Sequence, residues 1–496
     1  MSGNWLPRLW VKKASRFSNF GVRKREEIEV LLDENRLFPT DPAVRRLARD
    51  LYDGVRDMPI ISPHGHTEPR WYAENNPFPD PAHLFVTPDH YVFRMLHSQG
   101  IPLESLGVPR VDGEETEQDS RKIWKVFAEN YHLFRGTPSR IWIDHALQEV
   151  FGVKERLSVD TAEEIYDQVD HCLTQDAFRP RALFERFNIE AISTTDSAID
   201  DLKWHKMIRA SGWGGKVVPA YRPDAVVDPE FDGFRANVER MGELAGEDAT
   251  TWAGYLEAHR NRRAYFKSFG ATSSDHGHPT ARTEDLLQNE AAALFNKALQ
   301  GKCSPDEADA FRGHMLTEMA RMSLDDGLVL QIHPGSSRNH SASVMARFGR
   351  DKGYDIPTHT DYVRALRPLL DAVGNEPDLT IILFTLDETS YSRELAPLAG
   401  VYPALKLGPP WWFHDSYEGM MRFREMTTET AGFYNTVGFN DDTRAFCSIP
   451  ARHDVARRVD CSFLATLVAT GRLPEDEACD VAHDLAYRLA RQAYRL

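Results

Sequence analysis

The 496-residue sequence has few cysteines and no motif that pairs them closely. Its five cysteines are an odd number, and no two have the Cys-x-x-Cys spacing of a zinc ribbon or a redox motif. This pattern fits a reduced protein and predicts a cytoplasmic location. The cysteines are Cys172, Cys303, Cys447, Cys461 and Cys479.

Other absences argue against whole classes of protein. No apolar run reaches the roughly 18 residues of a membrane span. The start, Met1-Ser-Gly-Asn-Trp, lacks the charge and apolar stretch of a signal peptide. A formal net charge of −16 argues against a general nucleic-acid binder, which needs a basic face. The predicted partner is a small molecule, which a few local arginines could hold even if it is an anion.

Short apolar segments alternate with amphipathic helical segments along most of the chain. The composition, 42% apolar and 27% charged residues, is that of an ordinary globular protein with a large core or two domains. Repeated strand-then-helix order predicts a parallel sheet. The predicted strands are 58–64, 189–196, 216–222, a segment ending at 276, 328–333, 379–385, 404–407 and a last strand ending near 442.

Polar side chains gather where these strands end. A (β/α)₈ barrel carries its chemistry at this carboxyl-terminal rim, so the sequence predicts an α/β fold of the TIM-barrel type. An open doubly wound sheet is the alternative, but no Gly-x-Gly-x-x-Gly follows the first strand. The strand-end residues are His64, Asp196, Arg222, His276, His333 and Asp442.

Helical segments surround the predicted barrel. Asp41-Pro42 predicts a helix start, since an N-cap residue precedes a proline at the first helical position. The chain from 283 to 323 is expected to be a long helical stretch. The predicted divisions are an N-terminal helical segment (1–57), a catalytic barrel (58–70 and 181–450), a mostly helical insertion (71–180) and C-terminal helices (451–496).

His64-Gly-His66 is the most informative motif. It follows the apolar run Met58–Ile61, and residues two apart in a strand face the same side, so both imidazoles could bind one divalent metal. An accidental pair is the alternative, because the chain has 19 histidines. Asp442 and Arg444 would share a face by the same logic if the last strand extends that far, and an exposed ion pair is the alternative there.

Further candidates lie at or near other strand ends. His276 and His333 could each be a third metal ligand, an acid or base, a hydrogen-bond donor, or a structural histidine. Arg222 and Arg338 offer the bidentate fork that suits a carboxylate, or else pair with a neighbouring helix. Tyr91 and Arg94 lie on a segment that would usually pack on the barrel but could reach inward, and Trp411-Trp-Phe413 favours core packing.

Taken together, these segments resemble the uronate isomerase, or glucuronate isomerase, family of the amidohydrolase superfamily over most of the chain. So many motifs in one order are specific to the family, although any one alone is not. Departures are Ser62 and Ser197 at usually acidic positions, and Lys267-Ser268 in place of a common His-Glu pair. The motifs are His64-Gly-His66, Asp89-His-Tyr91…Arg94, Thr194-Thr-Asp196, Asp200-Asp-Leu…His205, Arg222-Pro-Asp224, Ser274-Asp-His-Gly277, Gln331-Ile-His333…Arg338-Asn339, Trp411-Trp-Phe-His-Asp415, Asp442-Thr-Arg444 and Arg452-His453.

The resemblance implies a distorted (β/α)₈ barrel with a helical insertion and one divalent metal, zinc first and manganese or another divalent ion as the alternatives. The implied reaction interconverts D-glucuronate with D-fructuronate and D-galacturonate with D-tagaturonate, and we expect a homo-oligomer. The implied residues are His64, His66 and Asp442 for the metal, with His276 as a further candidate; Tyr91, Asp442 and Arg444 for catalysis; and Arg222, Asp275, His333, Arg338 and Arg94 for the substrate.

Two other functions remain open from the residues alone. A metal-dependent hydrolase of an amide, ester or lactone would use the same His-x-His and late aspartate, but it needs no arginine array around a sugar acid. A catalytically dead or purely binding barrel is suggested by the lost acidic residues. The retention of His64, His66, Asp442 and Arg444 argues against it.

Overall fold

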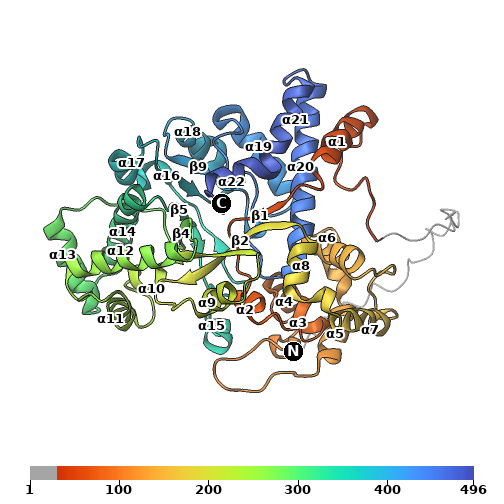
Figure 1. Cartoon of the computed structure of the whole chain (residues 1–496), viewed down its shortest axis with the longest axis horizontal. Helices are drawn as coiled ribbons and strands as arrows, with labels where there is room; N and C mark the ends of the chain where they lie inside the picture. Colours follow the sequence, from red (N-terminus) through yellow and green to blue (C-terminus); the bar gives the residue numbers. More distant parts are fainter. Residues whose placement is uncertain (1–30) are drawn as a thin grey trace, which may run out of the picture.

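The computed structural model describes residues 31–496. The signal-peptide expectation at the N-terminus and the first part of the helical segment expected over 1–57 lie outside these residues. Seven parallel strands form one sheet in the order β1-β2-β3-β4-β5-β8-β9, with helices around it (Figure 1). The strands are β1 Ile60–Ser62, β2 Ile189–Ser197, β3 Lys216–Arg222, β4 Ser273–His276, β5 Val329–Ile332, β8 Ile381–Leu383 and β9 Leu405–Leu407.

The eighth strand position is irregular, and the predicted strand ending near Asp442 is wrong. One backbone bridge joins Leu407 to Thr436, and the chain from 437 to 445 then runs as a loop. Gly438 and Asp442 have φ angles of 74° and 39°, which are incompatible with an extended ladder. The architecture is therefore the predicted (β/α)₈ barrel in a distorted form, in which a loop replaces the last strand.

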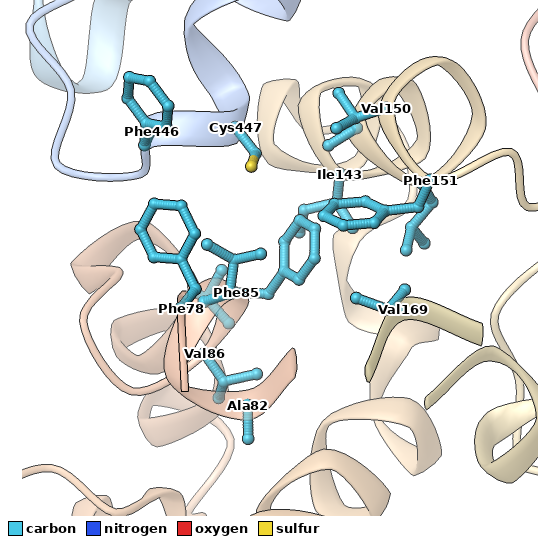
Figure 2. Close-up of a cluster of buried hydrophobic side chains, with 14 of the residues drawn as sticks. Phe78, Ala82, Phe85, Val86, Ile143, Val150, Phe151, Val169, Phe446 and Cys447 are labelled. Atoms are coloured by element: carbon cyan, nitrogen blue, oxygen red, sulfur yellow. The ribbon is translucent and has the colours of Figure 1, made fainter. Parts of the chain in front are cut away.

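The chain between β1 and β2 is helical. An apolar cluster joins these helices to the segment that follows the irregular eighth position: Phe446 lies beside Phe78, with ring centroids 6.1 Å apart, and Cys447 lies close by (Figure 2). This packing fixes the helix that carries Tyr91 relative to the loop that carries Asp442. The helices are α2 Pro69–Glu74, α3 Pro81–Phe85, α4 His90–Ser98, α5 Ser120–Glu129, α6 Pro138–His145, α7 Ala162–Leu173 and α8 Pro180–Arg186.

Helices after β2 cover the sheet. The helical stretch expected over 283–323 contains two helices, because Ser304 and Glu307 form a capping box that starts a new helix at Pro305. A short antiparallel hairpin, β6 Ser336–Ser337 and β7 Ile356–Pro357, follows β5. The helices are α9 Lys203–Ala210, α10 Asp224–Val227, α11 Phe234–Ala245, α12 Trp252–Ser268, α13 Gln288–Leu299, α14 Pro305–Asp326, α15 Ala342–Phe348, α16 Tyr362–Ala365, α17 Arg367–Val373, α18 Ala396–Ala399 and α19 Tyr417–Ala431.

The first described helix packs against the C-terminal helices. α1, Pro42–Val55, begins as predicted after Asp41, whose carboxylate accepts hydrogen bonds from two backbone N–H groups. It lies along α20, Ile449–Ala469, the long helix that follows the irregular eighth position. None of the helices in the described part of the chain is long and apolar enough to cross a membrane. The last helices are α21 Glu475–His483 and α22 Leu489–Ala493.

Candidate active site

A cavity of about 620 Å³ opens at the carboxyl ends of the strands. Its wall is rich in charged and histidine side chains, which come from strand ends and from the loops beyond them. Most of the predicted site residues meet here although the sequence separates them widely. The predicted residues in the wall are His64, His66, Tyr91, Arg222, Asp275, His333, Arg338, Asp442 and Arg444.

His64, His66 and Asp442 form a group with the geometry of a metal site. The Nε2 atoms of His64 and His66 lie 3.4 Å and 3.3 Å from Asp442 Oδ1. Tetrahedral coordination with bonds of 2.0–2.1 Å would place ligand atoms about 3.3–3.4 Å apart. Among residues 31–496, Asp442 Oδ1 has no hydrogen-bond partner, so the three atoms converge without bonding one another. These residues fit a divalent ion such as zinc.

The sequence pattern predicted that a strand end carries the two histidines, but they reach this group from a loop. β1 ends at Ser62, before His64. The His66 N–H donates to Thr443 O at 3.0 Å, and the Thr195 hydroxyl donates to Gly65 O at 2.9 Å. These bonds hold the His64–His66 loop against β2 and against the loop that carries Asp442.

A second group shares His64 with the first. His64, Asp275 and His333 offer ligand atoms within 4.8 Å of one another, and His333 Nδ1 lies 2.8 Å from Asp275 Oδ1. Burial opposes ionisation of Asp275, but Arg222 at 3.2 Å and His333 hold the pKa of that carboxyl well below its usual range. Burial lowers the pKa of His333 to about 4, so its imidazole is neutral near pH 7.

Tyr91 is placed by the first turn of α4. The Asp89 carboxylate caps this helix and accepts a hydrogen bond from the Tyr91 N–H at 2.8 Å. The Tyr91 ring packs on Trp142 and Trp412, with centroid separations of 5.4 Å and 4.7 Å. Burial raises the pKa of Tyr91, so the phenol keeps its proton at neutral pH and can act as a hydrogen-bond donor.

Arginines of the wall are held by carboxylates. Arg222 Nε donates to Asp224 at 2.7 Å, and Arg338 donates to Asp355 at 2.9 Å. The outermost of these carboxylates belongs to Asp351, which lies 3.7 Å from Arg444. Burial opposes ionisation of this carboxyl, but the positive charges of Arg444, Arg222 and Arg338 outweigh burial and lower the pKa of Asp351 to about 2.

Two predicted residues lie outside the wall. Arg94 projects over the rings of Phe413 and Trp412, 4.8 Å and 5.7 Å from their centroids, and the wall does not include it. His276 belongs to neither metal-like group, because alternation along β4 turns it away from the face of Asp275, and its ring lies 5.7 Å from that of His278.

Sequence reasoning missed several wall residues. Asp351 and Asp355 come from the segment spanned by the β6–β7 hairpin, whose two-residue strands leave no periodic signal. Trp411 and Trp412 belong to a buried apolar cluster, as the sequence predicted, and both also line the cavity, which the sequence did not predict. Trp412 has φ 54° and its indole N–H donates to Asp355 O at 2.9 Å, linking the hairpin segment to Tyr91. His90 could have been found from its place beside Tyr91.

Comparison with known proteins gives one consistent answer. The family model described as glucuronate isomerase matches residues 39–494. The uronate isomerase of Rhizobium meliloti (strain 1021) is 69% identical over 466 residues, covering 94% of this chain and 99% of that relative. The uronate isomerase of Brucella canis is 63% identical over 465 residues, covering 94% and 100%.

Solved structures agree with the sequence relatives. The crystal structure of glucuronate isomerase from Caulobacter crescentus superposes with a TM-score of 0.92 at 59% identity, covering 94% of this chain and 97% of that chain. The uronate isomerase from Thermotoga maritima superposes with a TM-score of 0.87 at 28% identity, covering 93% and 99%.

Proposed function

The chain belongs to the glucuronate isomerase family and isomerises hexuronates, and we propose that it does so with one divalent metal. In this proposal His64, His66 and Asp442 hold the metal beside the reacting carbons, and zinc is the preferred ion. The observation that carries this assignment is the convergence of the three ligand atoms at 3.3–3.4 Å. Manganese or another divalent ion is the alternative. The metal-dependent hydrolase is not favoured, because the relatives at 63–69% identity are uronate isomerases.

Isomerisation moves one proton from C2 to C1 and one from O2 to O1 through an enediol. A bound metal would act as a Lewis acid, stabilising the negative charge that develops on these oxygens. We assign Tyr91 as a donor to an oxygen at the reacting end, because its phenol remains protonated. Arg444 adds a planar cation at the same end. The Asp442 carboxylate, which lies beside His64 and His66, would accept a hydroxyl proton during ring opening.

The substrate's own carboxylate needs a cationic partner away from the reacting carbons. We propose Arg338 and Arg222 for this role, with His333 and Asp275 facing the sugar hydroxyls. Arg338 is oriented by Asp355, so its free N–H groups are presented to the cavity. Arginine suits this task because its fork bonds both carboxylate oxygens.

Arg338→Met is expected to raise KM for D-glucuronate about tenfold or more and to lower kcat far less. The lost bonds bind the carboxylate equally in the ground state and in the transition state. Steady-state kinetics would measure the changes in KM and kcat separately. Arg350→Met is the control, because Arg350 is at the cavity rim but pairs with exposed Asp232. A fall in kcat with unchanged KM would contradict the assignment.

A coupled assay tests the proposed function. D-glucuronate and D-galacturonate are offered separately, before and after chelation. Ketose formation should disappear on chelation and return with zinc or manganese. Turnover that survives complete removal of the metal would contradict the metal assignment. Metal-loaded protein that converts neither uronate would contradict the proposed reaction.

Three further expectations from the sequence stay predictions: a homo-oligomer, a cytoplasmic location and the lack of a nucleic-acid partner. All five cysteines are free thiols, in keeping with a reducing compartment. Sedimentation analysis of the purified chain would measure the oligomeric state.

A further inference from the structure

Arg452, in the first turns of α20, is a buried cation that the cavity wall does not include. Its side chain is 1% exposed and donates to Asp415 Oδ2 at 2.7 Å. Its guanidinium carbon lies 3.8 Å and 4.9 Å from the ring centroids of Trp142 and Tyr91. Arg452 thus contacts Tyr91, a residue of the cavity wall, from outside that wall.

The same guanidinium also reaches the loop that carries Asp442, one of the proposed metal ligands. Arg452 donates to Asp441 O at 2.9 Å, and His453 Nε2 lies 3.2 Å from the Asp441 carboxylate. The next residue, Asp442, has φ 39°, a left-handed conformation that is unfavourable outside glycine. The start of α20 therefore holds the turn in which Asp442 is strained.

We propose that Arg452 is a positioning residue for the isomerisation, holding Tyr91 at a fixed place relative to the Asp441–Asp442 turn. The inference depends on the proposed function, because Tyr91 and Asp442 are the residues through which Arg452 would act. A planar guanidinium can stack on an aromatic ring while bonding oxygens at its edge, and an ammonium group cannot. A buried ion pair is weak evidence for stability by itself, since apolar replacements are often as stable.

The fold offers a matched control in Arg424 and Asp460, which join α19 to the same helix α20. Arg424 donates to the Asp460 carboxylate at 2.7 Å and 3.1 Å, and its side chain is 5% exposed. Neither residue is in the cavity wall. Arg424→Lys should lose a comparable buried contact without changing the position of Tyr91.

The first measurement compares Arg452→Lys with Arg424→Lys in the metal-loaded enzyme. Arg452→Lys should lower kcat for D-glucuronate about 30-fold, with KM and the bound metal per chain within about threefold of the parent protein. Arg424→Lys should keep kcat within about threefold. Asp415→Asn and Asp460→Asn form a second matched pair, which carries the test if Arg452→Lys does not fold.

A double-mutant cycle with Tyr91→Phe separates positioning from general damage. If Arg452 acts through Tyr91, Arg452→Lys should cost less than about threefold in kcat once Tyr91 is phenylalanine. Equal losses in the Arg452 and Arg424 variants, or full multiplication of the two effects in the cycle, would overturn the inference. An inactive parent enzyme would instead overturn the proposed reaction, and a fully active Tyr91→Phe variant would overturn the donor role assigned to Tyr91.

Discussion

Asp442→Asn is expected to lower kcat about 1,000-fold or more and to lose the bound metal during purification. The change removes the anionic ligand that faces His64 and His66 at 3.4 Å and 3.3 Å, together with a proton acceptor. A catalytic metal contributes several kcal/mol, and each 1.36 kcal/mol is about tenfold in rate. Metal per chain and kcat should be measured on the same preparation, with circular dichroism as the check on folding.

Two control variants make this result specific. Asp351→Asn removes another carboxylate of the cavity wall, one that faces Arg444, and it should keep the metal. Asp275→Asn tests the second group that contains His64. If Asp275→Asn releases the ion and Asp442→Asn does not, the ion belongs to the second group and our metal assignment is wrong.

The sequence predicts elements best where one local signal decides them. β3 runs over 216–222 as expected, because its apolar residues are bounded by polar ones and it is buried along most of its length. α1 begins after Asp41 because capping and the following proline act within a few residues. The last strand is different: its apolar residues resemble a strand, but Gly438 and Asp442 adopt left-handed angles that an extended strand does not contain.

In the candidate site too, local sequence identifies some features and only the fold determines others. His64 and His66 could be predicted as a pair from their spacing and chemistry, yet the bonds from Thr195 and to Thr443 that bring them together join distant parts of the chain. Asp351 could not be predicted, since it meets Arg444 only through the fold of the hairpin segment. Residue type identifies which groups can do the chemistry, and loop geometry decides which of them meet.

Arg444 has a planar guanidinium that is positioned to bond the substrate. It follows Asp442 by two residues and lines the cavity, although the loop there is not the strand that was expected to align their side chains. Its side chain is 35% exposed, and its nearest acidic partner, Asp351, is 3.7 Å away. The guanidinium is therefore not locked in a tight internal ion pair and can bond the substrate.

Arg444→Lys is expected to lower kcat about 100-fold while the bound metal and the fold are retained. The positive charge remains, but two parallel N–H donors on a rigid plane become one mobile ammonium group, and loss of an oxyanion donor typically costs 10²–10³ in rate. Steady-state kinetics with both uronates would measure the loss. Arg350→Lys, at the cavity rim and paired with Asp232, should change kcat less than about twofold. If Arg444→Lys keeps full turnover, the charge alone suffices and Arg444 is not a bidentate donor in the transition state.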